Sequence, residues 1–227
     1  RDLVRSRGLG DVYKRQDNYL NFYIQLIINN LQDPEGEDID LLLKEMQVLN
    51  MLNTKYIIYN PGQFPIINMK AFGNAWFVDS YKIVDNPKAE INALETENLK
   101  RTAVLNKTKS DISKLPELTY TNDTARYVKL VNYEPDRLEF EIYTENAGFV
   151  VFSDVFYPKG WYAYVDGNLS TIYETNYILR GLVMPAGKHT VKFEFKPAPL
   201  YTGNKIALIG SFVVFFAFIL CLYTVSY

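Results

Sequence analysis

Two titratable side chains lie in settings that suit acid–base chemistry. Asp154 follows Ser153 in an otherwise apolar run, where a carboxyl group can have a raised pKa and act as a general acid. The same position also suits a β-bulge, or a carboxylate bound to a backbone N–H or to Arg180. His189 shares the face of an alternating run with Val191, and a general base needs a substrate within hydrogen-bond reach. We therefore expect structural roles for both side chains and predict no catalytic residue.

The composition provides few side chains that could bind a metal ion or a cofactor. His189 is the only histidine, and Cys221, the only cysteine, lies in a long apolar run. The acidic residues between 35 and 40 match no calcium-loop spacing. We predict no metal site, no cofactor and no disulfide framework.

Tyrosine side chains gather around the stretch YPKGWYAYVDG, residues 157–167. A tyrosine ring combines a flat apolar face with a polar hydroxyl, which suits a sugar ring or the membrane interface. The alternative is that these rings only cover a folded core. The predicted substrate contacts, to an acceptor glycan or to a membrane-embedded catalytic core, are Tyr162, Tyr164, Tyr173 and Tyr177.

The same stretch predicts a β-hairpin, which would set the direction of each side chain. Asp166-Gly167 is a strong signal for a type I′ turn, whose two central residues need positive φ. Successive residues of a strand point to opposite faces. We therefore expect Trp161 to point to the core and Tyr162 and Tyr164 to point away from it.

An antiparallel β-sandwich of the immunoglobulin-like kind is predicted for residues 119–200. The segments 137–143 and 188–196 alternate between apolar and polar residues, which is typical of half-buried strands. Residues 148–157 are almost continuously apolar, which indicates a central strand covered on both faces. Turn signals recur between these strands, as expected of a sandwich.

A small mixed α/β unit is predicted for residues 17–107, with the polar segment 108–118 as the linker to the sandwich. Apolar positions at helical spacing predict helices, and runs of aromatic and β-branched residues predict strands. Asn86-Pro87 suits a helix N-cap followed by proline at the first helical position. The predicted helices are 17–31, 39–52 and 86–98, and the predicted strands are 54–60, 75–84 and 101–107. The fold class is therefore α+β.

A transmembrane helix is predicted for residues 204–227. Residues 206–227 form an uncharged apolar run of 22 residues. A helix of this length spans about 33 Å, against about 30 Å for the hydrocarbon core of a bilayer. A buried core helix is the alternative, but such helices usually carry charges within a shorter distance.

Both ends of the chain suggest a piece of a longer protein. Residues 1–16 resemble a translated sequencing-adaptor segment, and we exclude them from the fold prediction; a genuine basic arm is the alternative. They carry a net charge of +3, which leaves −5 for the rest of a chain whose net charge is −2. An acidic remainder gives no electrostatic basis for binding nucleic acid.

Four segments together resemble the C-terminal extracytoplasmic region of the YfhO family of bacterial membrane proteins. The combination is more specific than any one segment, and the resemblance covers residues 17–227. The segments are LNMLNTKYIIY (49–59), GNAWFVDSYKIV (73–84), VVFSDVFYPKGWYAYVDG (150–167) and YILRGLVMPAGKHTVKFEF (177–195).

The resemblance implies a large membrane protein similar to GT-C-type glycosyltransferases, which use a polyprenyl-phosphate sugar to modify envelope polymers such as teichoic acids. The catalytic acidic residue would lie in an N-terminal membrane region outside this chain, so the chain itself is expected to be non-catalytic. The implied partners are membrane lipid and, through the missing membrane core, the polyprenyl-phosphate sugar and the envelope glycan. The implied location is the bacterial cytoplasmic (inner) membrane, with the soluble part extracytoplasmic.

Two functions from different classes stay open. In the first, the chain is a structural or acceptor-positioning part of a glycosyltransferase-like membrane protein. In the second, it is a non-enzymatic, membrane-anchored β-sandwich that binds a glycan or a protein at the cell surface. The sequence upstream of residue 17 in the intact gene would separate them, because the first requires many further membrane helices.

Overall fold

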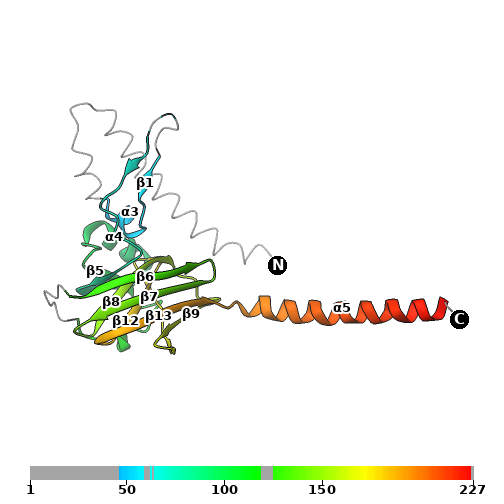
Figure 1. Ribbon diagram of the computed structural model, residues 1–227. Helices are drawn as coiled ribbons and strands as arrows, with labels where there is room; N and C mark the ends of the chain where they lie inside the picture. Colours follow the sequence, from blue (N-terminus) through cyan, green and yellow to red (C-terminus); the bar gives the residue numbers. More distant parts are fainter. Residues whose placement is uncertain (1–45, 59–61, 63, 119–124, 226–227) are drawn as a thin grey trace.

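The computed structural model (Figure 1) describes residues 46–58, 62, 64–118 and 125–225. The expected helix at 17–31 lies outside the described residues, as does the segment 1–16. Of the expected helix at 39–52, the described part contains α3, Gln47–Met51. A two-stranded hairpin follows α3 and is formed by β1 (Tyr56–Ile57) and β2 (Ile66–Ile67).

One layer of the fold is a five-stranded sheet in the order β10-β9-β13-β7-β6. All neighbouring strands in it run antiparallel. The alternation in β7 matches the prediction, because Leu138, Phe140 and Ile142 are buried while the residues between them are only partly buried. The strands are β6 (Tyr127–Glu134), β7 (Arg137–Thr144), β9 (Trp161–Val165), β10 (Asn168–Ser170) and β13 (Gly187–Phe195).

The second layer is a six-stranded sheet in the order β3-β8-β12-β11-β5-β4. β4 and β5 run parallel, and α4 (Pro87–Thr96) connects them. Asn86 caps α4, since its side chain accepts a hydrogen bond from the backbone N–H of Ala89, as the Asn-Pro pair predicted. The strands are β3 (Ala75–Val78), β4 (Ser80–Val84), β5 (Thr102–Asn106), β8 (Gly148–Val155), β11 (Tyr173–Thr175) and β12 (Leu179–Met184).

Hydrophobic clusters lie on both faces of the six-stranded sheet. The cluster on one face includes Val151 of β8 and Leu94 of α4. The cluster on the other face joins β8 to the five-stranded sheet. There the ring of Phe152 lies 5.0 Å from that of Phe140 and 4.9 Å from that of Phe193, in edge-to-face geometry. The domain therefore has three layers, with the six-stranded sheet in the middle.

The first five residues of β8 are buried in the middle layer. Its residues 149–152 are all 0% exposed, which confirms the predicted central strand covered on both faces. Gly181 of β12 lies beside the ring of Phe149, and a Cβ at this glycine would come within 2.3 Å of the ring. The absence of a side chain at Gly181 therefore leaves the space that the Phe149 ring occupies.

The six-stranded sheet curls until its two edges meet at Asp79. The edge strands β3 and β4 are separated in the chain by this one residue, yet they occupy opposite ends of the strand order. The edges of a flat six-stranded sheet would lie about 24 Å apart, far beyond the reach of one residue. The rings of Tyr81 on β4 and Phe149 on β8 lie 5.3 Å apart across the curl. The predicted strand 75–84 is thus divided between the two edges.

The predicted hairpin is formed by β9 and β10. Asp166 and Gly167 have φ of 50° and 81°, as a type I′ turn requires. The Asp166 carboxylate accepts a hydrogen bond from the backbone N–H of Thr190 at 2.9 Å and lies 2.6 Å from Nδ1 of His189. The bond to Asp166 raises the pKa of His189, and the bond to His189 lowers the pKa of Asp166. His189 therefore has the expected structural role, because it ties the hairpin turn to β13.

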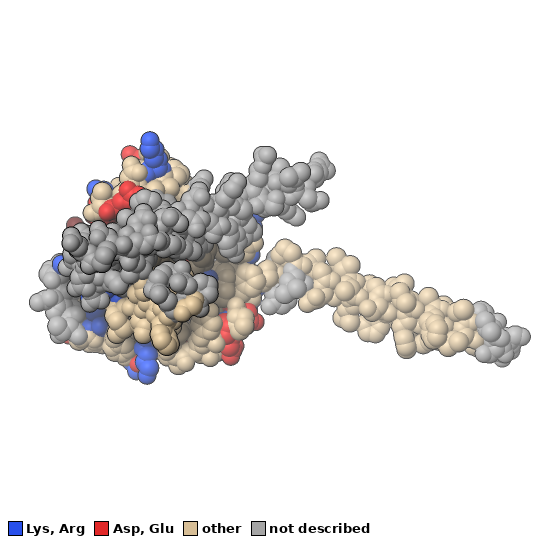
Figure 2. All heavy atoms as spheres, turned by 90° about the horizontal axis from the view of Figure 1, so that it is seen from above, with Lys and Arg blue, Asp and Glu red and all other residues tan. Residues whose placement is uncertain are grey.

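A single helix, α5 (Ala198–Val225), follows β13 and extends away from the domain (Figure 1). Its segment Thr202–Tyr223 is long and apolar enough to cross a membrane, and none of it is buried against the domain. Figure 2 shows charged residues over the domain and an uncharged surface along most of α5. The predicted C-terminal transmembrane helix is thus present as a candidate span.

The α+β fold class is confirmed, including two facing β-sheets and a small helix-containing unit. The division of the chain at 108–118 stays a prediction. Hydrogen-bonded strands connect the two predicted units, since β5 pairs with β11 at Leu105 and Thr175. β3 likewise pairs with β8, so the middle sheet contains strands from both predicted units.

Replacing Gly181 with alanine should destabilise the protein, because the Phe149 ring is fully buried and has no space to move. We expect the free energy of unfolding to fall by about 1–3 kcal/mol, the usual cost of overpacking a core. Denaturant unfolding of the whole chain in detergent micelles measures this change. Gly210→Ala is the control, since its Cβ would meet nothing within 4 Å. Equal stability of the Gly181→Ala variant and the wild type would contradict the close packing of β8 on β12.

Replacing Asp166 with asparagine should lower the pKa of His189. Asn-Gly is also favourable in a type I′ turn, so the variant keeps the hairpin and loses the charge. In the wild type, the raised pKa of His189 contributes stability below its unfolded pKa of about 6.5, and this contribution is lost as the pH rises through the folded pKa.

NMR titration measures this pKa directly, because the chain has one histidine. We also expect the fall in unfolding free energy above pH of about 6.5 to be smaller in Asp166→Asn. An unchanged pKa in the variant would rule out the ion pair.

Candidate functional site

Tyr162 and Tyr164 lie on the outer face of β9, as the alternation predicted. Ala163 between them is fully buried, and Tyr162 is 42% exposed. Tyr164 lies opposite Lys192 of β13, and the Lys196 ammonium is 5.8 Å from the centre of the Tyr164 ring. The two tyrosine rings therefore lie on the outer face of the sheet, beside charged side chains of the neighbouring strand β13.

Of the other two predicted contact residues, Tyr173 lies in β11 of the six-stranded sheet, and Tyr177 lies in the turn between β11 and β12. They are only 4% and 8% exposed and belong to the cluster that packs against the helices. Tyr177 follows Asn176 in a tight turn where both residues have positive φ, of 73° and 49°. The structure therefore brings Tyr162 and Tyr164 together but places Tyr173 and Tyr177 in the core. A substrate contact by any of the four stays a prediction.

A buried carboxylate holds the turn that contains Tyr177. Glu90 of α4 is 0% exposed and accepts a hydrogen bond from the backbone N–H of Tyr177 at 3.0 Å. It also accepts one from the Asn106 side-chain amide at 3.2 Å and lies 3.1 Å from the Lys109 ammonium. These three contacts satisfy a charge that would be very costly to bury alone. Glu90 thus stabilises a strained turn, and the sequence alone does not single it out.

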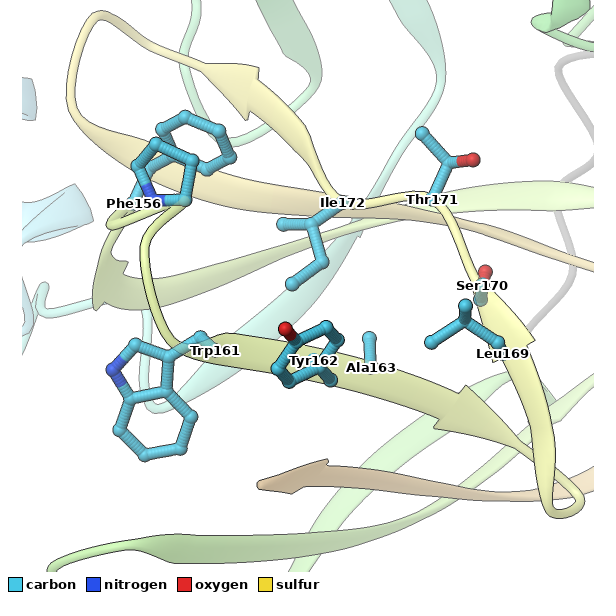
Figure 3. Close-up of a pocket in the computed structure, with 9 residues that line it drawn as sticks. Phe156, Trp161, Tyr162, Ala163, Leu169, Ser170, Thr171 and Ile172 are labelled. Atoms are coloured by element: carbon cyan, nitrogen blue, oxygen red, sulfur yellow. The ribbon is translucent and has the colours of Figure 1, made fainter. Parts of the chain in front are cut away.

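A pocket of about 330 Å³ lies next to Tyr162, at the edge of the five-stranded sheet (Figure 3). We refer to it as the hairpin pocket. Its walls are mostly apolar, with the hydroxyls of Ser170 and Thr171 on one side. Small-molecule sites commonly have this size and this mixture of apolar walls with few polar groups. The lining residues are Phe156, Pro158, Trp161, Tyr162, Ala163, Leu169, Ser170, Thr171 and Ile172.

The base of the hairpin pocket is fixed by packing around Trp161. The guanidinium of Arg180 lies 4.3 Å from the centre of the Trp161 ring, and the Phe195 ring is 5.2 Å from it. Gly160 has φ of 149°, and a Cβ there would come within 2.6 Å of the Phe195 ring. The backbone N–H of Lys196 donates a hydrogen bond to the Gly160 carbonyl at 2.6 Å. The YPKGW segment is therefore held against the end of β13, where the chain continues into α5.

Asp154 lies at a β-bulge, which was one of the two structural roles expected for it. Leu179 of β12 pairs with Val155, whereas the next residue, Arg180, pairs with Phe152. Burial raises the pKa of Asp154, and the positive charge of Arg180 opposes this effect only in part. Arg180 itself is 4% exposed and donates from Nε to the Val155 carbonyl at 2.9 Å.

The bulge opens a second, smaller cavity that the sequence does not reveal. It has a volume of about 190 Å³ and is lined by side chains from four separate parts of the chain. We refer to it as the polar cavity. Of its lining residues, the sequence singled out Asp154; Asn53 also carries a signal, because asparagine after a helix often adopts positive φ, and its φ is 55°.

The described residues contain no group of three or more His, Cys, Asp or Glu side chains that could hold a metal ion. The two cavities are lined by aromatic rings, amides, hydroxyls and the Asp154 carboxyl group. Their chemistry favours hydrogen bonding and stacking with a ligand.

Comparison with known proteins identifies the family. A protein-family model described as bacterial membrane protein YfhO matches residues 82–207, from β4 through both sheets into the first turns of α5. No curated protein and no solved structure matches the chain. The match covers more than half of the 227 residues and contains two of the four segments that carried the resemblance, 150–167 and 177–195. The chain therefore belongs to the YfhO family of bacterial membrane proteins.

Proposed function

We propose that this chain is the non-catalytic extracytoplasmic part of a glycosyltransferase-like protein of the bacterial cytoplasmic membrane, and that it positions the acceptor glycan. The parent would transfer a sugar from a polyprenyl phosphate to an envelope polymer. The observation that carries the proposal is the location of the hairpin pocket beside the strand that leads into the membrane helix. An acceptor held there would stay close to the lipid surface.

The distance from the pocket to the bilayer follows from the chain itself. Trp161 of the pocket pairs with Phe195, and α5 begins three residues later at Ala198. The eight residues from Ala198 to Lys205, which precede the uncharged run, rise about 12 Å along the helix axis. The headgroup layer on each side of a bilayer is about 5–8 Å thick. The base of the hairpin pocket would thus lie close to the lipid headgroups. A lipid-linked sugar reacts at this depth.

The chemistry of the surface also suits a glycan. A sugar ring has apolar C–H faces and a rim of hydroxyls. The hairpin pocket offers apolar walls, the hydroxyls of Ser170 and Thr171, and the half-exposed ring of Tyr162 at its edge. Tyr164 extends this aromatic surface along β9 towards Lys192 and Lys196. Such a surface would bind a neutral or weakly acidic polymer better than an apolar ligand.

A second function, binding of a protein partner by a non-enzymatic anchored domain, is favoured by the β1–β2 hairpin. This hairpin exposes several large apolar side chains to solvent, including Phe64 at 95%, Met69 at 79% and Ile58 at 70%. Large apolar side chains that are exposed close together in the chain are more typical of a protein–protein interface than of a free surface. A two-stranded hairpin is also only marginally stable by itself, so a partner would stabilise it.

The double substitution Tyr162→Ala and Tyr164→Ala in the full-length parent should impair polymer modification. Each ring offers an aromatic contact of about 0.5–1.5 kcal/mol, so we expect the KM for the acceptor to rise about tenfold while folding is retained. Incorporation of labelled sugar into envelope polymer, measured at several acceptor concentrations, tests this.

The matched control is Tyr127→Ala with Tyr143→Ala. These rings stack at 6.0 Å on β6 and β7, in the same sheet but away from the hairpin pocket. Unchanged modification by a folded Tyr162/Tyr164 variant would remove the acceptor-positioning function. An equal loss in both double variants would show that the hairpin has no special role.

A further inference from the structure

The polar cavity lies where the β8 bulge meets the segments around α3 and β3. Among the described pockets it is unusual in that polar atoms dominate its lining. Phe140 forms part of its apolar floor, and Tyr133, which is 70% exposed, lies at its rim. The lining residues are Leu52, Asn53, Asn74, Leu130, Tyr133, Phe140, Ser153 and Asp154.

The bulge directs polar groups into this cavity. Since Leu179 pairs with Val155 and Arg180 with Phe152, residues 153 and 154 have no paired partner on β12. Ser153 is instead held by the loop before β3: its backbone N–H donates to the Asn74 carbonyl at 2.9 Å, and its Oγ donates to the Gly73 carbonyl at 2.6 Å. These bonds fix the backbone that carries Asp154.

Two amide side chains also line the cavity. Asn53 donates from Nδ2 to Oδ1 of Asn74 at 3.0 Å, which orients both amides. The Oδ1 atom of Asn53 is buried and accepts no hydrogen bond from the part of the chain that the structure describes. A buried acceptor without a donor costs free energy, and a ligand hydroxyl or N–H would remove that cost.

The charges around the cavity favour a neutral ligand. Asp154 is the one carboxyl group in the lining, and it would repel an anion. The guanidinium of Arg180, close enough to Asp154 to interact with its charge, would repel a cation. Burial also raises the pKa of Asp154, which weakens the charge available to a metal ion. A small neutral molecule with several hydroxyls matches the amides, the carboxyl group and the exposed aromatic ring together.

We propose that the polar cavity binds a single neutral sugar ring, with ring hydroxyls donating hydrogen bonds to Asn53 Oδ1 and to the Asp154 carboxyl group. Tyr133 covers one face of the ring from the rim. The volume of about 190 Å³ has room for one ring and no more. This site is separate from the hairpin pocket, shares none of its lining residues, and does not depend on the parent being a glycosyltransferase.

The test uses the whole chain reconstituted in lipid nanodiscs, titrated with glucose, mannose and N-acetylglucosamine and followed by ligand-detected NMR. We expect at least one of these sugars to bind with millimolar affinity. Asn53→Gly should raise its Kd about tenfold, because glycine keeps the positive φ and removes only the amide. Asp154→Asn, which keeps the shape and one hydrogen-bonding oxygen, should have a smaller effect in the same direction.

Tyr162→Ala is the control, because it alters the hairpin pocket and leaves the polar cavity intact. An unchanged ring signal of His189 in each variant shows that the fold is retained. If none of the three sugars binds, or if Asn53→Gly binds as tightly as the wild type, the proposal is wrong. If Tyr162→Ala alone abolishes binding, the sugar site is the hairpin pocket, which supports the proposed function and overturns this inference.

Discussion

The structure depends on the burial of β8 on both of its faces. Residues 149–152 alternate between the cluster under the helices and the cluster shared with the five-stranded sheet, and none of the four is exposed. A strand of this kind must lie in the middle of a three-layer fold. Its neighbours adapt to it: Gly181 leaves space for the Phe149 ring, and β3 closes its other edge. The apolar run ends at Ser153-Asp154, and at this point the ladder to β12 is interrupted by the bulge.

Both candidate sites lie where this core ends. The polar cavity opens at the bulge, and the hairpin pocket lies where the chain turns from β8 through Pro158 and Gly160 into β9. The close contact between Gly160 and the Phe195 ring anchors that turn to the end of β13. A membrane helix follows directly, so the geometry of the domain and the position of the lipid surface are coupled through one short segment. This coupling would hold any ligand of the hairpin pocket at a defined height above the lipid.

Local patterns in the sequence predicted much of the fold. The alternation in β7, the continuous apolar run of β8, the Asn86 cap of α4 and the Asp166-Gly167 turn are all confirmed, because each depends on residues close together in the chain. The curl of the sheet could not be predicted this way, since strand 75–84 is divided at Asp79 by pairing with two distant strands. Burial of Tyr173 and the wall formed by Asn53 and Asn74 likewise depend on long-range contacts.

β3, β5 and β8 belong to one cooperative sheet, which holds together the segments that line the polar cavity. Hydrogen–deuterium exchange of the whole chain in nanodiscs measures this most directly, because amides of one cooperative unit exchange with a common free energy of opening. We expect residues 75–78 and 102–106 to be protected to the same extent as residues 148–152 and 179–184. Loss of protection in the first two segments while the last two remain fully protected would contradict it.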